Sequence, residues 1–270
     1  MESRKGNGIF LGIVSVATLI VAIIGATFAY FSASTESNTD AVNLTAYEFK
    51  LSLSVSPIYP EGASALIPLN PTTKIKADNG KYIKYDETGK LVSTDIEEEG
   101  MNNLQYALNE AEKKCIDSQG LQVCALYQVT IENQAVNELT LNGQLKTITN
   151  NPGEGEGKTP FSNLTYHALE GDHETGLTLV GDAVTIAEEI EGVVDIASVT
   201  IPGATTDEDG ELVPGKGYSY VLIYLNDNED QSGEMGASFT GQLIYTSGGE
   251  GGTNLTGTFS VSAPVEEPAE

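Results

Sequence analysis

Apolar residues recur at every second position along this chain, and this alternation restricts the fold more than any other sequence feature. The clearest run extends from Leu121 to Ile131, where apolar side chains alternate with residues such as Gln122 and Gln128. A period of two places successive side chains on opposite faces of a β-strand, so one face of this strand should be apolar and the other wet.

Similar short runs, separated by Gly, Pro, Asn and Asp, predict roughly ten strands. They lie at residues 42–55 (with a bulge near Tyr47), 81–92 (a hairpin), 121–131, 138–148 (two strands with a turn at Asn142-Gly143), 164–169, 177–180, 193–201, 218–225 (a central strand), 237–246 and 255–262. Residues 102–114 and 182–192 predict short helices. The expected fold is mainly β: a two-sheet, jelly-roll-like β-sandwich with one or two short helices in its connections.

A hydrophobic helix is expected before this domain. Residues 9–31 contain no charged side chain and follow Arg4 and Lys5, the pattern of an export signal or a membrane anchor. Thr27 and Ala29 are small enough for the two pockets of a signal peptidase, which predicts cleavage before Tyr30. An uncleaved anchor is the alternative, and the chain would then contact a membrane only through residues 9–31.

The domain organisation follows from these segments. Residues 1–29 form the signal peptide or anchor, 30–41 a mobile segment, 42–262 the sandwich and 263–270 an acidic flexible tail. The mobile segment is a candidate donor strand, because its residues alternate and lack an apolar run that would fold back on the domain. The donor residues are Tyr30, Phe31, Ala33 and Thr35, which alternate with Ser32, Ser34 and Glu36. A disordered tether is the alternative.

The charge of the chain excludes one class of partner. It has 13 Lys and Arg against 39 Asp and Glu, a formal net charge of −26. Nucleic acid binding relies on dense Lys and Arg, so no nucleic acid partner is expected. The same charge opposes self-association at low ionic strength, and salt or divalent cations should promote it.

Two cysteines, Cys115 and Cys124, predict a structural disulfide, in agreement with export. Two geometries are open. In one, Gln119-Gly120 is a two-residue hairpin loop that places Cys115 opposite Cys124. In the other, the bridge ties the end of the helix at 102–114 to the next strand.

Neither catalysis nor a bound metal is expected. The chain contains no H-E-x-x-H motif and no G-x-S-x-G elbow. His167 and His173, with Glu170 and Asp172 between them, are interpreted as surface residues beside an acidic turn. Asp227 and Asp230 are the candidates for calcium, although solvated turns explain them as well. The sequence therefore predicts no enzyme and no cofactor.

Several stretches together resemble one protein family. They are the export segment GIVSVATLIVAIIGATFAYFSAS followed by AVNLTAYEFKLSLSV, then YQVTIENQAVNELTLNGQL and YVLIYLNDNEDQSGEMGASFTGQLIYTS. This combination resembles the TasA/camelysin family, which Gram-positive-type bacteria export through a dedicated SipW-type signal peptidase. The resemblance implies a secreted jelly-roll protein of the cell surface or matrix, whose mature N-terminal segment adds to a neighbour's sheet to build fibres. The cysteine pair departs from that family's pattern.

The expected function is therefore structural. The chain is predicted to be an exported cell-surface or extracellular-matrix protein, a biofilm-matrix fibre subunit that self-associates into a homopolymer by β-strand donation. The alternative is a membrane-anchored monomeric adhesin or a calcium-stabilised binding module.

Overall fold

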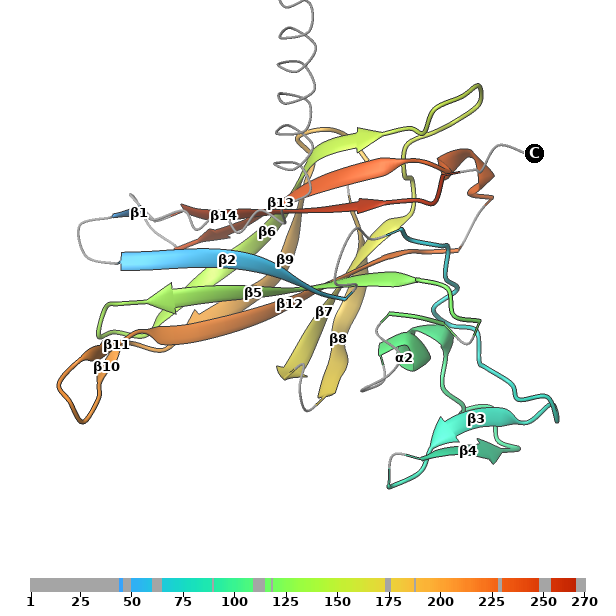
Figure 1. Ribbon diagram of the computed structural model, residues 1–270, viewed down its shortest axis with the longest axis horizontal. Coiled ribbons are helices and arrows are strands. Elements are labelled where there is room, and N and C mark those ends of the chain that lie inside the picture. Colours follow the sequence, from blue (N-terminus) through green and yellow to red (C-terminus); the bar gives the residue numbers. More distant parts are fainter. Residues whose placement is uncertain are drawn as a thin grey trace, which may run out of the picture. The chain divides into compact units, whose positions relative to one another are not determined.

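The computed structural model describes ten stretches of the chain, all within the compact unit Asn38–Glu270 (Figure 1). They are residues 44–45, 50–59, 65–88, 90–108, 115–117, 119–172, 176–186, 188–227, 230–247 and 254–265. In this part of the chain no helix is long and apolar enough to cross a membrane. The predicted hydrophobic helix at residues 9–31, the donor segment and most of the acidic tail lie outside the described residues.

The first of two large sheets has six strands, and every neighbouring pair is antiparallel. Its order is β1 (Leu44–Thr45), β2 (Lys50–Tyr59), β5 (Cys124–Asn133), β12 (Gly215–Leu225), β7 (Leu164–Asp172) and β8 (Gly176–Thr185). The predicted central strand is confirmed, because β12 lies between β5 and β7. Its apolar side chains serve both faces: Val221 and Ile223 join one core cluster, and Leu222 and Tyr224 join another.

The second large sheet has four antiparallel strands. Its order is β14 (Asn254–Ser262), β13 (Ser238–Thr246), β6 (Leu139–Asn151) and β9 (Val193–Ile201). Strands β6, β13 and β14 follow the alternation expected from the sequence, with residues such as Leu145, Leu243 and Phe259 buried and their neighbours more exposed, whereas β9 changes phase at Ala197-Ser198. The predicted mainly β class, built of antiparallel sheets, is confirmed.

One hydrophobic core joins these two sheets. Leu53 and Ile131 from the six-stranded sheet share a cluster of buried side chains with Leu141 and Tyr245 from the four-stranded sheet. Strand β14 contacts β2, and β9 contacts β12. At Gly257 the sheets approach so closely that a Cβ atom would collide with the side chains of Leu53 and Val55. Burying apolar surface on both inner faces is the main source of stability for such an arrangement.

A second apolar layer covers the opposite face of the six-stranded sheet. It contains α2 (Asn103–Leu108), whose Leu104 and Ala107 are buried against β5 and β12 residues such as Leu126 and Leu222. Asn102 precedes the helix, and its Oδ1 accepts a hydrogen bond from the amide of Gln105 at 2.8 Å. The Asn102 amide in turn donates to Gln105 Oε1 at 3.0 Å, an arrangement like a capping box that fixes the helix start. The remainder of the predicted helix, residues 109–114, lies outside the described part of the chain.

Three small elements complete the fold. The predicted hairpin at 81–92 is confirmed as β3 (Tyr82–Tyr85) and β4 (Leu91–Thr94), and two residues of β3, Ile83 and Tyr85, pack against a small cluster that includes Tyr106 of α2. Strands β10 (Thr205–Thr206) and β11 (Leu212–Val213) form a second hairpin, and η1 (Ser232–Glu234) is a single 3-10 turn before β13.

The predicted single bulged strand at 42–55 is wrong. The chain instead reverses between β1 and β2, so that Leu44 pairs with Leu51 and Thr45 with Lys50. A reversal and a bulge both shift the phase of an alternating pattern, and the alternation alone does not separate them. Because β1 has two residues, most of β2 has no strand partner on that side among the described residues. Pro57, which has no N–H to donate, is therefore compatible with this strand.

The predicted turn at Asn142-Gly143 is also wrong. Strand β6 runs through both residues, and its pairing with β9 shifts register between Leu141 and Gly143. A Cβ atom on Gly143 would lie 2.6 Å from the carbonyl oxygen of Ala197 and 2.8 Å from Ile196 Cγ1. Glycine is present here because another strand approaches closely, and not because the chain turns.

The predicted helix at 182–192 is a third correction. Strand β8 continues to Thr185, which pairs with Thr165, and the amide of Ile186 donates to the carbonyl of Leu164 at 2.8 Å. Pairing with β7 and burial of Ile186 outweigh the weak helical pattern of this segment.

Candidate functional site

Strand β8 forms one edge of the six-stranded sheet. Among the described residues it pairs with β7 alone, in a register that joins Glu170 to Thr178 and Ala168 to Val180. The backbone N–H and C=O groups on its other side make no hydrogen bonds to a described strand. An additional strand can pair with such groups. At ten residues, β8 is much longer than β1, the strand at the other edge.

A pocket lies beside this edge. It has a volume of about 820 Å³ and is open to solvent, and Leu177, Thr178 and Leu179 of β8 form one wall. The opposite wall comes from the hairpin and helix layer: Lys74, Lys84, Tyr85, Glu98, Glu99, Gly100, Met101, Gln105 and Leu108. Leu177 and Leu179 also pack against the apolar layer on this face of the sheet. The free edge and the pocket therefore form a continuous site.

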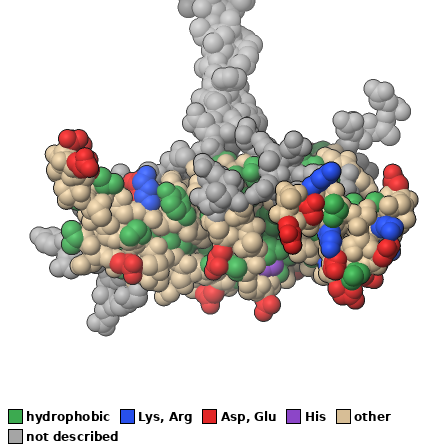
Figure 2. Space-filling model, turned by 90° about the horizontal axis from the view of Figure 1, so that it is seen from below, with side chains coloured by type: hydrophobic (Ala, Val, Ile, Leu, Met, Phe, Trp, Pro, Cys, Tyr) green, Lys and Arg blue, Asp and Glu red, His purple; other side chains and the backbone are tan. Residues whose placement is uncertain are grey.

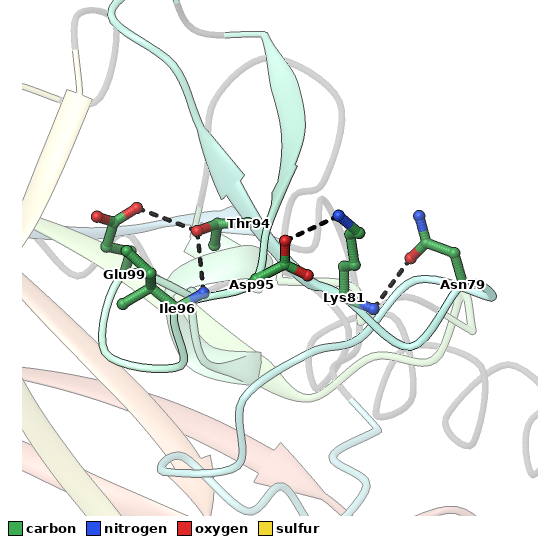
Figure 3. A network of polar contacts seen from close by, with 6 residues as sticks. All are labelled: Asn79, Lys81, Thr94, Asp95, Ile96 and Glu99. Carbon is green, nitrogen blue, oxygen red and sulfur yellow. Dashed lines mark hydrogen bonds and ion pairs between the residues drawn. The ribbon is translucent and has the colours of Figure 1, made fainter.

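Polar contacts brace the hairpin that forms the outer wall (Figure 3). Lys81 Nζ lies 2.9 Å from Asp95 Oδ2, and the Lys81 amide donates to Asn79 Oδ1 at 3.0 Å. Thr94 Oγ1 donates to Glu99 Oε2 at 3.2 Å. The ion pair with Lys84, followed by the Thr94 hydroxyl, lowers the pKa of the Glu99 carboxyl below its usual value. These contacts are exposed, so each contributes little stability, but together they fix the wall's shape.

The charge near this site differs from that of the chain as a whole. Of the 13 Lys and Arg residues, five fall between residues 74 and 90. Figure 2 shows most of the visible lysine and arginine side chains at one end of the molecule, mixed with acidic ones. The pocket itself carries Lys74 and Lys84. This surface is therefore less repulsive to an acidic segment than the remainder of a strongly acidic protein.

The predicted disulfide is confirmed. Cys115 and Cys124 are bonded, their Cα atoms lie 4.9 Å apart, and both side chains are completely buried. The structure differs in part from each of the two predicted geometries of the bridge. Ile116 bridges to Gln122, which gives a loop one residue longer than Gln119-Gly120. Asp117 Oδ1 stabilises that loop by accepting from the amides of Gln119 and Leu121.

The second predicted geometry, in which the bridge ties the helix to the next strand, is correct in that connection. The Cys115 amide donates to the carbonyl of Ala107 in α2, and Cys124 is the first residue of β5. The bridge thus links the segment that follows the helix to the sheet beneath it.

The structure does not bring the histidine candidates together into a metal site. His167 occupies a bulge of β7, and its Nε2 lies 3.2 Å from the carbonyl oxygen of Gly181. Glu170 is exposed, and His173 and the side chain of Asp172 lie outside the described residues. Where side chains are described, no group of three or more His, Cys, Asp or Glu residues is positioned to hold a metal.

Asp227 and Asp230, the calcium candidates, are both exposed in the connection between β12 and β13. Asp230 Oδ1 accepts from the amide of Ser232 at 3.0 Å, and this bond lowers the pKa of the Asp230 carboxyl. Asn226, which begins the acidic run that contains these two residues, holds a buried oxygen, and so do Gln231 and Glu234 of the same connection, which the sequence analysis missed. Nothing in the local pattern distinguishes them from solvated loop residues, because their burial depends on the distant Ser162-Asn163 segment.

The cleavage residues Thr27 and Ala29 and the donor residues Tyr30, Phe31, Ala33 and Thr35 lie outside the described part of the chain.

A scan against models of known protein families finds no match. A search of curated proteins likewise finds no similar sequence.

Proposed function

We propose that this protein is an exported structural subunit with a jelly-roll-like β-sandwich, which assembles with copies of itself by β-strand donation at the cell surface or in the extracellular matrix. The observation that carries this proposal is the free edge of β8 beside an open pocket. An extended segment that pairs with β8 gains backbone hydrogen bonds along the edge, and alternate side chains enter the pocket.

The N-terminal segment of the chain has the chemistry that this site requires. Phe31, Ala33 and Thr35 alternate with polar residues, so one side of an added strand can face Leu177, Leu179 and the rest of the pocket. The other side then carries serines and an acid into solvent. The pocket wall carries two lysines and two glutamates, so it lacks the net negative charge that would repel this segment elsewhere on the protein.

The two edges of the four-stranded sheet are less suitable. At the end of β14, the carbonyl of Ser262 already accepts from the amide of Leu66 at 2.6 Å. On β9, the amide of Ala197 donates to the hydroxyl of Tyr166 at 3.2 Å. The contact of Ser262 occupies an edge carbonyl that an added strand would need, whereas β8 combines an open edge with a pocket for side chains.

Cross-linking between subunits tests the register of this contact. In an added strand Ser32 and Thr178 both lie on the wet side, so S32C and T178C should form an intermolecular disulfide in the exported, oxidised protein. A ladder of covalent oligomers on a non-reducing gel is the expected result. The matched control replaces T178C by S260C, an exposed position on β14.

Two results would contradict the proposal. One is an equal ladder from the S260C control. The other is a protein whose assembly, observed by electron microscopy and sedimentation at moderate salt, is unchanged when residues 30–40 are deleted. Mass spectrometry of the exported protein also distinguishes the two classes of function. A mature chain starting at Tyr30 has a free donor segment, whereas retention of residues 9–29 favours the membrane-anchored monomer.

A further inference from the structure

A ring of hydrogen bonds closes the connection between β12 and β13 onto the segment that precedes β7. The amide of Asn226 donates to the carbonyl of Asn163 at 3.0 Å, and the side-chain Nε2 of Gln231 donates to the carbonyl of Asn226. The amide of Glu234 donates to the carbonyl of Gln231 at 3.0 Å. Ser162, the neighbour of Asn163, bonds Glu234 and completes the ring. These five residues, Ser162, Asn163, Asn226, Gln231 and Glu234, are called the loop ring below.

Glu234 is a buried carboxylate with one unsatisfied oxygen. Its side chain points into the loop ring, where Oε1 accepts from the amide of Ser162 at 2.9 Å and from its hydroxyl at 2.5 Å. The residue is 3% exposed, and Oε2 is buried without a hydrogen-bond partner. A buried carboxylate is stable only where a cation, a proton or a full set of donors offsets its desolvation.

Two amide oxygens of the same ring are also unsatisfied. Gln231 is 8% exposed, and because its Nε2 is committed to the carbonyl of Asn226, its Oε1 is fixed in orientation and has no partner. Asn226 Oδ1 is buried and unpartnered as well. The ring thus contains three buried oxygens without a hydrogen-bond partner but one buried donor without a partner, Asn163 Nδ2. An excess of buried acceptors costs free energy unless a positively charged or donor species lies among them.

The chemical type of these oxygens indicates which positively charged species suits the ring. They comprise one carboxylate and two amide carbonyls, with no nitrogen or sulfur ligand, and Asp227 and Asp230 stand exposed on the same connection. Hard cations prefer such ligands, and Ca²⁺ in particular accepts mixed carboxylate and amide oxygens with water completing its shell. A proton on Glu234 would supply one donor and leave the two amide oxygens unsatisfied, whereas a cation bound among the three oxygens would offset all of them.

We propose that the loop ring is a calcium site, in which Glu234 Oε2, Gln231 Oε1 and Asn226 Oδ1 hold the ion and Asp227 or Asp230 contributes from the rim. Bound Ca²⁺ ties β12 and β13 to the segment before β7, and so joins strands of the two large sheets. The site does not depend on strand donation, and a failure of either proposal leaves the other standing.

Calcium titration of the full-length protein tests the site. After treatment with EGTA, isothermal titration calorimetry should show one Ca²⁺ per chain, with a dissociation constant on the order of 10⁻⁴–10⁻³ M as in extracellular modules. The midpoint of thermal unfolding should rise with Ca²⁺ concentration. E234Q should abolish both effects. In EGTA, E234Q should unfold at or above the wild-type midpoint, because the uncompensated buried charge is gone, and the order should reverse in excess Ca²⁺.

D209N is the matched control, since it removes one exposed carboxylate from the β10–β11 hairpin and should leave the Ca²⁺ response unchanged. N226A provides a second test should E234Q fail to fold. The Oδ1 atom that it removes has no partner in the ring, so N226A should keep its fold and weaken Ca²⁺ binding at least about tenfold, a difference of roughly 1.4 kcal/mol.

Three outcomes would overturn the proposal. The first is a wild-type protein with no Ca²⁺ response, which means that water or a proton satisfies the ring. The second is an equal response in wild type and E234Q, which means general screening of an acidic protein. The third is an N226A variant that folds and binds Ca²⁺ as the wild type does.

Discussion

At the scale of single residues, Gly143 shows how tertiary contacts select an amino acid. A Cβ atom at this position of β6 would lie 2.6 Å from the carbonyl oxygen of Ala197 in β9. We expect G143A to lower the free energy of unfolding by about 1–3 kcal/mol, the cost of overpacking a rigid interior. Urea denaturation measures the change.

Asn142→Ala is the control for Gly143, because Asn142 is exposed and adjacent on the same strand. If residues 142–143 formed a turn, N142A would be the more damaging change. Equal stabilities of G143A and wild type would contradict the close approach of β6 and β9.

Tyr224 gives a prediction at alkaline pH. Burial in the apolar layer raises the pKa of its hydroxyl from 10.0 to about 12. The folded state therefore retains this proton where the unfolded state has lost it, so stability is full below pH 10 and declines as the pH rises toward 12. Y224F removes this contribution, and circular dichroism should show an alkaline unfolding midpoint shifted to higher pH.

Tyr218 is the control for this measurement, since it is 51% exposed on the same strand. Y218F should leave the alkaline midpoint where it is in the wild type. A Y224F midpoint that coincides with that of Y218F would show that burial of Tyr224 does not affect alkaline unfolding.

At the scale of elements, the disulfide links α2 to the sheet through a short loop. We expect C115S/C124S to remain folded and to lose about 2–3 kcal/mol of stability, since closing a short loop removes limited entropy from the unfolded chain. Both side chains are fully buried, so new hydroxyls add a cost of their own. C115A/C124A separates that cost from the loss of the bridge. A double alanine variant as stable as the wild type would contradict the prediction.

The pocket beside β8 also arises at this scale, because it needs several elements at once. The edge strand supplies one wall, and α2 with the β3–β4 hairpin supplies the other. The sequence predicts each element locally, as the strand at 177–180, the short helix at 102–114 and the hairpin at 81–92. Their arrangement around an open volume is not predicted locally, because it follows from which face of the sheet the helix covers.

At the scale of the whole molecule, charge opposes the proposed assembly. With a formal net charge of −26, subunits repel one another over the screening length, which falls from roughly 30 Å at 0.01 M salt to roughly 8 Å at 0.15 M. Sedimentation in EGTA should therefore show an assembled fraction that rises as NaCl is added across this range. Sucrose at equal osmolarity is the control and should have little effect. Assembly that decreases with NaCl would mean that attraction between opposite charges drives it.

The sequence by itself determined the features that depend on local periodicity. Alternation located β5, β13 and β14, and apolar residues on both faces located β12 at the centre of its sheet. Two nearby cysteines in a chain with an export-like N-terminus predicted the bridge between Cys115 and Cys124. These features are predictable because the burial of each side chain follows from its position along a single strand.

Tertiary structure alone decided the features that depend on contacts between distant segments. The reversal between β1 and β2, the passage of β6 through Asn142-Gly143 and the extension of β8 to Thr185 each depend on pairing with another strand. The loop ring depends in the same way on Ser162-Asn163, more than 60 residues before Asn226. Local sequence carries no record of such a partner, because backbone hydrogen bonds and the burial of polar atoms are determined only when the two segments meet.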